Sequence, residues 1–281
     1  MKEINDLNTI KHMKIIQEMS LMDNFLMNFV FNDDPESVEK LIRPILNIHD
    51  LKVISSVSQS LKQNTYGRDA RFDIEAVDDK GRRYDIEIQR DNRYAIPERA
   101  RYYSAMIDYH FMNHKRKNEK EEKDDNPFRK LPESYVIFFT ERDFFKKGIP
   151  IYHIDRYVRD ISYHPFVDRA HIIYVNCSYD KRGDPVGDII HDLKQTDPSR
   201  ILNSTLRNRV KLIKRDHQEG KYMSEAIEKV NEEEIAAVKE DSIRSAISLH
   251  RDFDPNADKE TIVSKVSEKF SADRELVERL F

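Results

Sequence analysis

Apolar and polar residues alternate strictly over two short stretches of the chain, residues 71–77 and 83–89. A period of two is typical of a β-strand with one buried face. The intervening residues 78–81 read DDKG, which are turn-forming residues, and Gly81 can adopt a positive φ. The pattern predicts a β-hairpin. The apolar residues expected to share one face of its first strand are Phe72, Ile74 and Ala76.

The length of the turn fixes which residues of the hairpin face each other. A five-residue loop at 78–82 is an allowed hairpin length. The resulting pairs are Val77 with Arg83, Glu75 with Asp85, Asp73 with Glu87, and Arg71 with Gln89. Facing like charges have Cβ atoms roughly 5 Å apart and are destabilising. One face would hold two stacked carboxylate pairs and no lysine, which a hard divalent cation would stabilise. The alternative is an ordinary solvated outer face.

Helical periodicity and further apolar runs flank the hairpin. Helices are expected at 7–32, 36–46 and from Pro97 onward, and strands at 51–59, 135–140 and 169–176. Pro44 is expected to end or kink the second helix near Arg43. The charged run 115–132 lacks periodicity, which favours a surface loop. This order predicts an α/β (α+β) fold, with a small mixed β-sheet flanked by helices.

The pattern changes towards the C-terminus, where almost every segment from Val186 onward has helical periodicity. Two short helices are expected at 259–270 and 272–281, with Asp258 and Ser271 as N-caps. We therefore divide the chain into residues 1–200, which contain the sheet, and 201–281, a helical C-terminal region. The terminal helix pair could bind DNA, a partner chain or the rest of its own chain.

Composition narrows the class of protein. The 14 Phe and 13 Tyr supply large core side chains, although 36% of residues are charged. A net charge of −4 means that affinity for phosphate must come from a local basic patch. The single cysteine, Cys177, excludes an intrachain disulfide and fits a reducing compartment as a buried thiol. No run approaches the ~20 apolar residues of a membrane span. We expect a soluble cytoplasmic protein that has no membrane partner.

Asp73, thirteen further residues and then Glu87-Ile88-Gln89 resemble the D…(D/E)-x-K signature of the PD-(D/E)XK nuclease superfamily. A series of blocks in the same order is similar to one branch, the PD-(D/E)XK family transposases or recombination-promoting nucleases. These blocks are GRDARFDIEAVDDKGRRYDIEIQRD, AIPERARYYSAMID, LPESYVIFFTERD, GIPIYHIDR, HIIYVN and VGDIIHDLKQTDPS. The resemblance, from about Leu21 to about Ser199, implies a restriction-endonuclease-like core with an α-helical C-terminal tail.

The resemblance also implies a metal site on the hairpin. Asp73 and Glu87 would be metal ligands, and Ile88 would add its backbone carbonyl. Gln89 stands where the superfamily most often has lysine, although this branch commonly has glutamine. An uncharged amide can still orient a water molecule or a phosphate oxygen. The way in which the attacking water is activated therefore stays open.

Residues outside this motif complete the implied site. Arg99 and Tyr103 match a family pattern of arginine followed four residues later by tyrosine. Arg99 would face the scissile phosphate, and Tyr103 is either catalytic or a core residue. Asp23 resembles an acidic position at which some relatives place a further metal ligand. Asp85 and Glu75 match no family catalytic position.

The implied activity is Mg²⁺-dependent hydrolysis of DNA phosphodiester bonds, with Mn²⁺ as a substitute cation and a link to recombination or mobile elements. Candidate phosphate contacts near the hairpin are Arg68, Arg71, Arg90, Arg93, Arg99 and Arg101. A second strip could comprise Arg207, Arg209, Lys211, Lys214 and Arg215, but a solvated helix face is the favoured interpretation of these residues. The alternative function is a catalytically weak or inactive nuclease fold that binds nucleic acid or a protein partner. The oligomeric state stays open, with a homodimer as one option.

Overall fold

The structure is a computed structural model that describes residues 16–64, 68–118, 126–179, 181–218, 243, 247, 258–270 and 273–281. It divides into two compact units, Met1–Gln218 and Glu219–Phe281. The helix α6 (Ser204–Gln218) packs against α2 (Asn24–Phe31) and α3 (Pro35–Leu46). It is therefore part of the first unit, which also contains the sheet.

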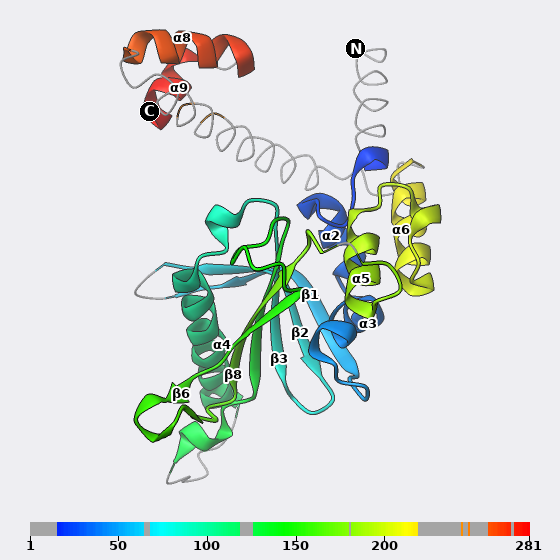
Figure 1. The fold of residues 1–281 in the computed structure, drawn as a ribbon, viewed down its shortest axis with the longest axis vertical. Helices are drawn as coiled ribbons and strands as arrows, with labels where there is room; N and C mark the ends of the chain where they lie inside the picture. Colours follow the sequence, from blue (N-terminus) through cyan, green and yellow to red (C-terminus); the bar gives the residue numbers. More distant parts are fainter. Residues whose placement is uncertain are drawn as a thin grey trace. The chain divides into compact units, whose positions relative to one another are not determined.

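A six-stranded mixed sheet forms the centre of the first unit, in the order β1-β2-β3-β4-β8-β5 (Figure 1). The strands are β1 (Val53–Lys62), β2 (Ala70–Asp78), β3 (Arg83–Gln89), β4 (Ser134–Thr140), β5 (Ile151–Ile154) and β8 (Ala170–Asn176). The strands β3, β4 and β8 are parallel, whereas β1, β2 and β5 run antiparallel to their neighbours. A separate pair comprises β6 (Tyr157–Val158) and β7 (His164–Pro165). The small mixed sheet predicted from the sequence is confirmed.

Helices cover both faces of this sheet (Figure 1). The long helix α4 (Pro97–Asn118) packs on one face, where Ala100 and Tyr103 contact Phe138 and its neighbours. The helices α2, α3, α5 (Pro185–Lys194) and α6 pack on the other face. Because both faces are covered, every residue of β4 is buried, which explains its unbroken apolar run. The helix-flanked, restriction-endonuclease-like fold expected from the sequence is confirmed.

Short 3₁₀ turns connect several of these elements. They are Asn92–Tyr94, Pro127–Lys130, Arg159–Ile161 and Pro198–Arg200. The second of them falls in the charged run 115–132, of which residues 119–125 lie outside the described residues. The start of the run continues α4 as far as Asn118, so the expectation of loop throughout is wrong there.

The hairpin has the predicted register from Ile74 to Val77, whereas the expected pairs Asp73–Glu87 and Arg71–Gln89 lie beyond the regular pairing. Val77 pairs with Arg83, and Gly81 in the turn has φ 77°. Asp78 organises the turn, since its fully buried carboxylate accepts hydrogen bonds from the Arg82 backbone N–H at 2.8 Å and from Arg82 Nε at 2.5 Å. The same carboxylate accepts the hydroxyl of Tyr84 at 2.8 Å. The turn therefore sets the pairing of the two strands that carry the predicted metal ligands.

The predicted alternation fails at one point of β2. Phe72 lies in the core beneath α4, whereas Ile74 lies in the core on the opposite face, so the prediction that these two share a face is wrong. Gln59 of β1 has φ 51° at this level. Regular pairing with β3 ends at Ile74, and the backbone N–H of Asp73 donates to a side chain instead. These irregularities at Gln59 of β1 and Asp73 of β2 interrupt the strict alternation of side chains.

The expected continuous helix over residues 7–32 is also wrong, although residues 7–15 lie outside the described residues. The chain turns between Met19 and Asp23, and α2 begins at Asn24. The buried ammonium of Lys214 accounts for the break. It donates to the carbonyls of Gln17 at 2.9 Å and Met19 at 2.7 Å, which therefore need no partner in a continuing helix.

Helix ends follow local capping chemistry. Asp34 caps α3 by accepting the Ser37 backbone N–H at 3.2 Å, but the helix runs through Pro44 to Leu46, so the expected end near Arg43 is wrong. In the second unit α8 (Lys259–Phe270) and α9 (Arg274–Leu280) confirm the two expected terminal helices. Asp273 caps α9 in place of Ser271, which lies outside the described residues.

We expect Asp78→Ala to lower the free energy of unfolding by about 3–5 kcal/mol, because it leaves the Arg82 guanidinium and the turn donors without their buried acceptor. Urea denaturation followed by far-UV circular dichroism measures the loss. Asp79→Ala is the matched control, since its side chain is exposed and its backbone N–H donates to the Lys52 carbonyl at 2.9 Å, which the substitution leaves in place. A loss equal to that of the control would contradict the role of Asp78.

Candidate active site

Two carboxylates cross the gap between β2 and β3 where the regular pairing of these strands ends. Glu87 Oε1 accepts the backbone N–H of Asp73 at 3.0 Å, and Asp73 Oδ2 accepts the backbone N–H of Ile88 at 3.1 Å. Each predicted ligand is thus held by the strand of the other. The fold brings Asp73, Glu87 and Ile88 together, as the sequence motif predicts.

Gln89 lies beside both carboxylates. Its amide Nε2 donates to Glu87 Oε2 at 3.1 Å and to Asp73 Oδ2 at 3.3 Å. An uncharged donor therefore stands at the point where the two acidic side chains converge. Gln89 therefore belongs to the same site as Asp73 and Glu87, although its amide cannot supply a positive charge.

The first turn of α4 places an arginine over this pair. Proline is tolerated in the first turn of a helix, so Pro97 starts α4 two residues before Arg99, and Tyr103 follows one turn later on the same side. Arg99 Nη2 donates to Glu87 Oε2 at 2.5 Å, and Nη1 donates to Gln89 Oε1 at 3.4 Å. Burial alone would lower the pKa of Arg99, but the charges of Glu87 and Asp73 and the Tyr103 phenol together outweigh burial, and the pKa rises.

The ring of Tyr103 packs against the Arg99 guanidinium. The guanidinium carbon lies 4.8 Å from the centre of the Tyr103 ring, and the hydroxyl donates to the backbone carbonyl of Arg71 at 3.1 Å. Burial, together with the charge of Glu87, raises the pKa of Tyr103 to about 12. The phenol is therefore neutral near pH 7, and its contacts are those of a side chain that orients Arg99.

The acidic face of the hairpin is buried beneath α4. Asp73 is 8% exposed, and Asp85 and Glu87 are 0% exposed, so the solvated-face alternative is wrong. Burial, followed by the charge of Asp73, raises the pKa of both Asp85 and Glu87 well above the ordinary range. Charging this face without a compensating cation is therefore costly.

Glu75, directly opposite Asp85, has a different environment. It accepts Lys62 Nζ at 2.5 Å and Ser60 Oγ at 2.7 Å, both from β1. Burial alone would raise the pKa of Glu75, but Lys62, Ser60 and Arg83 together outweigh burial, and the pKa falls. The expectation of an acidic face without lysine is wrong, because the cation comes from a neighbouring strand that the hairpin pattern does not reveal.

The remaining charges fit one divalent cation. When all three carboxyl groups are ionised, Asp73, Asp85 and Glu87 carry three negative charges and Arg99 carries one positive charge, which leaves a net charge of −2. In the part of the chain that the structure describes, no group of three His, Cys, Asp or Glu side chains is arranged as a metal cage. Mg²⁺ commonly binds to one or two carboxylates and completes its shell with water and phosphate. Asp73 and Glu87 meet that requirement.

A sequence model of the PD-(D/E)XK nuclease family transposases matches residues 39–275, which is most of the chain. The chain belongs to this family. The match includes the hairpin and the whole of α4. No curated protein and no solved structure matches the chain. In the described residues, no helix is both long and apolar enough to cross a membrane.

Among the described residues of this family member, no group of three potential metal ligands includes Asp23. Its carboxylate forms an ion pair with Arg90 Nη1 at 2.5 Å and accepts the backbone N–H of Ser20 at 2.8 Å. Arg90 directly follows Gln89, so Asp23 lies near the same end of β3. The contacts assign it to the turn before α2, and its role as a ligand stays a prediction.

The predicted basic residues have two different environments. In the later strip, Arg207, Arg209 and Lys214 donate to backbone carbonyls of their own chain, so these three hold α6 in place. Near the hairpin the exposed arginines are Arg68, Arg71, Arg90, Arg93 and Arg101. Two of these form ion pairs, Arg90 with Asp23 and Arg93 with Asp91. The hairpin side therefore presents more exposed basic residues than the later strip, in which Lys211 and Arg215 are exposed.

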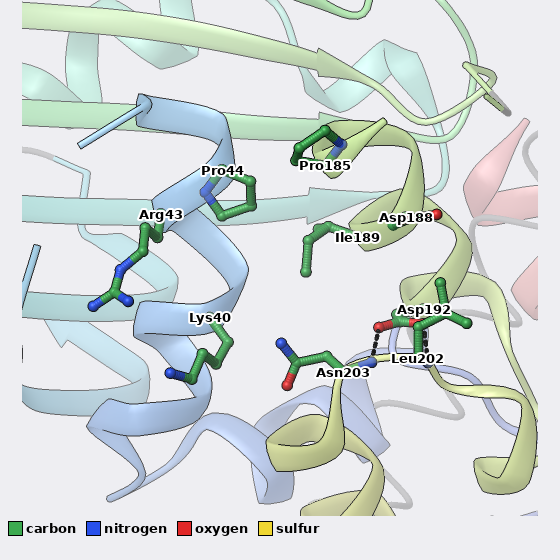
Figure 2. Close-up of a pocket in the computed structure, with 9 residues that line it drawn as sticks. All are labelled: Lys40, Arg43, Pro44, Pro185, Asp188, Ile189, Asp192, Leu202 and Asn203. Atoms are coloured by element: carbon green, nitrogen blue, oxygen red, sulfur yellow. Dashed lines mark hydrogen bonds between the residues drawn. The ribbon is translucent and has the colours of Figure 1, made fainter. Parts of the chain in front are cut away.

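A pocket of about 360 Å³ lies between α3 and α5, on the other layer of the fold (Figure 2). Lys40 and Arg43 approach it from α3, and Asp192 approaches it from α5. Asp192 accepts the backbone N–H groups of Leu202 at 2.6 Å and Asn203 at 2.9 Å. Asp192 thus anchors the chain before α6, and none of the predicted site residues lines this pocket.

The buried thiol of Cys177 does not take part in the site. Burial raises its pKa to about 12, so the thiolate is scarce at neutral pH. The expectation of a buried rather than a nucleophilic cysteine agrees with this environment.

The two facing carboxylates Asp85 and Glu75 should respond oppositely to neutralisation in metal-free protein. The raised pKa of Asp85 means that its ionisation destabilises the fold as pH rises, so Asp85→Asn should raise the free energy of unfolding at about pH 8 by about 1–3 kcal/mol. The lowered pKa of Glu75 means that its ionised form stabilises the fold, so Glu75→Gln should lower the free energy of unfolding there.

Urea denaturation in EDTA at several pH values measures both effects. Both differences should shrink as the pH falls towards about 4, where carboxyl groups become protonated in the unfolded state. Destabilisation by Asp85→Asn at high pH would contradict the environment described for this residue.

Proposed function

We propose that this protein is a metal-dependent endonuclease that hydrolyses DNA phosphodiester bonds. Asp73 and Glu87 would hold Mg²⁺, with the Ile88 carbonyl as a further ligand. The observation that supports this proposal is the buried Asp73–Glu87 pair, bridged by Gln89 and overlain by Arg99. Membership of a transposase family connects the cleavage to recombination or mobile elements.

When bound, Mg²⁺ would lower the pKa of a water molecule and stabilise the charge that develops on the phosphoryl group. Mn²⁺ shares the preference for oxygen ligands and would substitute. The raised pKa of Glu87 implies that cation binding is accompanied by loss of a proton, so affinity for the cation increases with pH. The chain contributes a pair of anchored carboxylates whose orientation is set by backbone donors.

Arg99 and Gln89 would act on the DNA directly. A guanidinium presents two parallel donors that match a phosphate group, and the stacking of Arg99 on Tyr103 limits its orientation. The Gln89 amide would orient the attacking water or a phosphate oxygen, because it has no basic group that could remove a proton. The exposed residues Arg68, Arg71 and Arg101 would contact neighbouring phosphates.

One observation favours the second candidate function, a nuclease fold that binds nucleic acid or a partner without efficient cleavage. Glu87 Oε2 already accepts hydrogen bonds from both Arg99 and Gln89. A cation must displace at least part of this arrangement before it can bind. If it cannot do so, the site remains closed and only binding survives.

Neutralising either ligand separates these two functions. With supercoiled plasmid and Mg²⁺, we expect Asp73→Asn and Glu87→Gln to reduce nicking at least about 10³-fold, since each removes a carboxylate that anchors the cation. Asp79→Asn, on the exposed turn of the same hairpin, should cleave like the wild type. Excess EDTA should abolish nicking by the wild type. Equal cleavage by all variants, or none by the wild type together with a gel shift of DNA, would favour the binding function.

Substitution of Gln89 tests whether its contribution is a donor or a charge. Gln89→Ala removes the amide that bridges Asp73 and Glu87 and should lower kcat about 10²-fold. Gln89→Lys keeps a donor in reach of both carboxylates and should retain kcat within about tenfold of the wild type. Single-turnover nicking rates at saturating Mg²⁺ give the comparison. A kcat of Gln89→Ala equal to that of the wild type would contradict a role for the amide.

A further inference from the structure

Asp85 is a buried carboxylate that the proposed cleavage does not use. It lies two positions before Glu87 on β3, so its side chain leaves the same face of the strand, beneath α4. Both of its oxygens are buried, and neither accepts a hydrogen bond from an N–H or hydroxyl donor among the described residues. In the metal-free arrangement of the described residues, this carboxylate therefore has no structural role that would explain its burial.

Glu87 cannot bind a cation through Oε2 without releasing donors. That oxygen accepts Arg99 Nη2 at 2.5 Å and Gln89 Nε2 at 3.1 Å, and the other carboxylate oxygen accepts the Asp73 backbone N–H. The guanidinium is the strongest competitor, because it carries a full positive charge in a largely buried place. Once displaced, it needs another acceptor, since an unpaired buried cation is costly.

Asp85 is well placed to be that acceptor. The Arg99 guanidinium is stacked over the ring of Tyr103, one turn further along α4, and so already extends along the helix away from its first turn. The charge of Arg99 acts on Asp85, and that of Asp85 acts on Tyr103. By contrast, Glu75 across the strand pair is already bonded to Lys62 and Ser60.

We propose that Asp85 is a positioning residue that receives the Arg99 guanidinium when Glu87 binds a divalent cation, before DNA arrives. This proposal rests on the proposed function, because it requires a cation at Glu87. In the metal-free state Arg99 closes the site by bonding to Glu87. In the cation-bound state Asp85 holds Arg99 clear of the ligand, until a phosphate group provides a third acceptor.

A double-mutant cycle on cation affinity tests this exchange without DNA. The probe is Mn²⁺ alone, with the free ion counted by electron paramagnetic resonance. Asp85→Asn should weaken Mn²⁺ binding about tenfold, because the displaced Arg99 loses its acceptor. Arg99→Met, which keeps apolar packing on Tyr103 but removes the competing cation, should tighten binding about tenfold. In the Arg99→Met background, the further substitution Asp85→Asn should change affinity less than about threefold.

The matched control is Glu75→Gln, which removes a carboxylate directly opposite Asp85 but leaves the proposed acceptor of Arg99 in place. It should change Mn²⁺ affinity less than about threefold. Denaturation curves confirm that each variant is folded at the temperature of the titration. Arg99→Met without tighter binding would overturn the proposal, because Arg99 would then not compete for Glu87.

The remaining outcomes are equally decisive. Equal losses from Asp85→Asn in both backgrounds would overturn the exchange and assign Asp85 a role as a direct ligand or a simple source of negative charge. No loss in either background would also overturn it. If wild type and Glu87→Gln both fail to bind Mn²⁺, the proposed function itself fails. Binding by the wild type that is lost in Glu87→Gln, with an additive cycle, removes only the role of Asp85.

Discussion

At the open end of the hairpin, the carboxylates of Asp73 and Glu87 replace the backbone hydrogen bonds that would otherwise join β2 to β3. Each acid is oriented by an N–H group of the other strand, so their separation depends on the backbone and not on flexible side chains. This exchange also ends the regular pairing at Ile74 and turns Phe72 towards α4. The site and the irregular strand are therefore two results of the same interaction.

The cost of burying like charges explains the elements around this pair. The helix α4 excludes water from the acidic face, which raises the pKa of Asp85 and Glu87. The same helix supplies Arg99, whose charge partly offsets that cost. Under the proposed function, a divalent cation at Asp73 and Glu87 would offset the rest of this cost. The buried charge thus links the stability of the fold to the metal-dependent cleavage that we propose.

Asp85 and Glu75 show that the surroundings of a carboxyl group decide the direction of its pKa shift. They face each other across two strands, yet the pKa of Asp85 rises and that of Glu75 falls. The difference comes from β1, which brings Lys62 to Glu75 and no donor to Asp85. Similarly, Lys214 donates to main-chain carbonyls at the break before α2, although its sequence context suggested a contact for phosphate.

Local pattern alone was sufficient to predict the hairpin, its register and the helix that follows Pro97, because alternation, turn length and proline act over a few residues. The family motif identified Asp73 and Glu87 as a pair. Only the tertiary structure revealed that α4 buries their face, that Lys62 neutralises Glu75 and that Asp85 accepts no hydrogen bond from an N–H or hydroxyl group among the described residues. These facts depend on contacts between elements far apart in the chain, and a one-dimensional pattern contains no information about which distant cation reaches which acid.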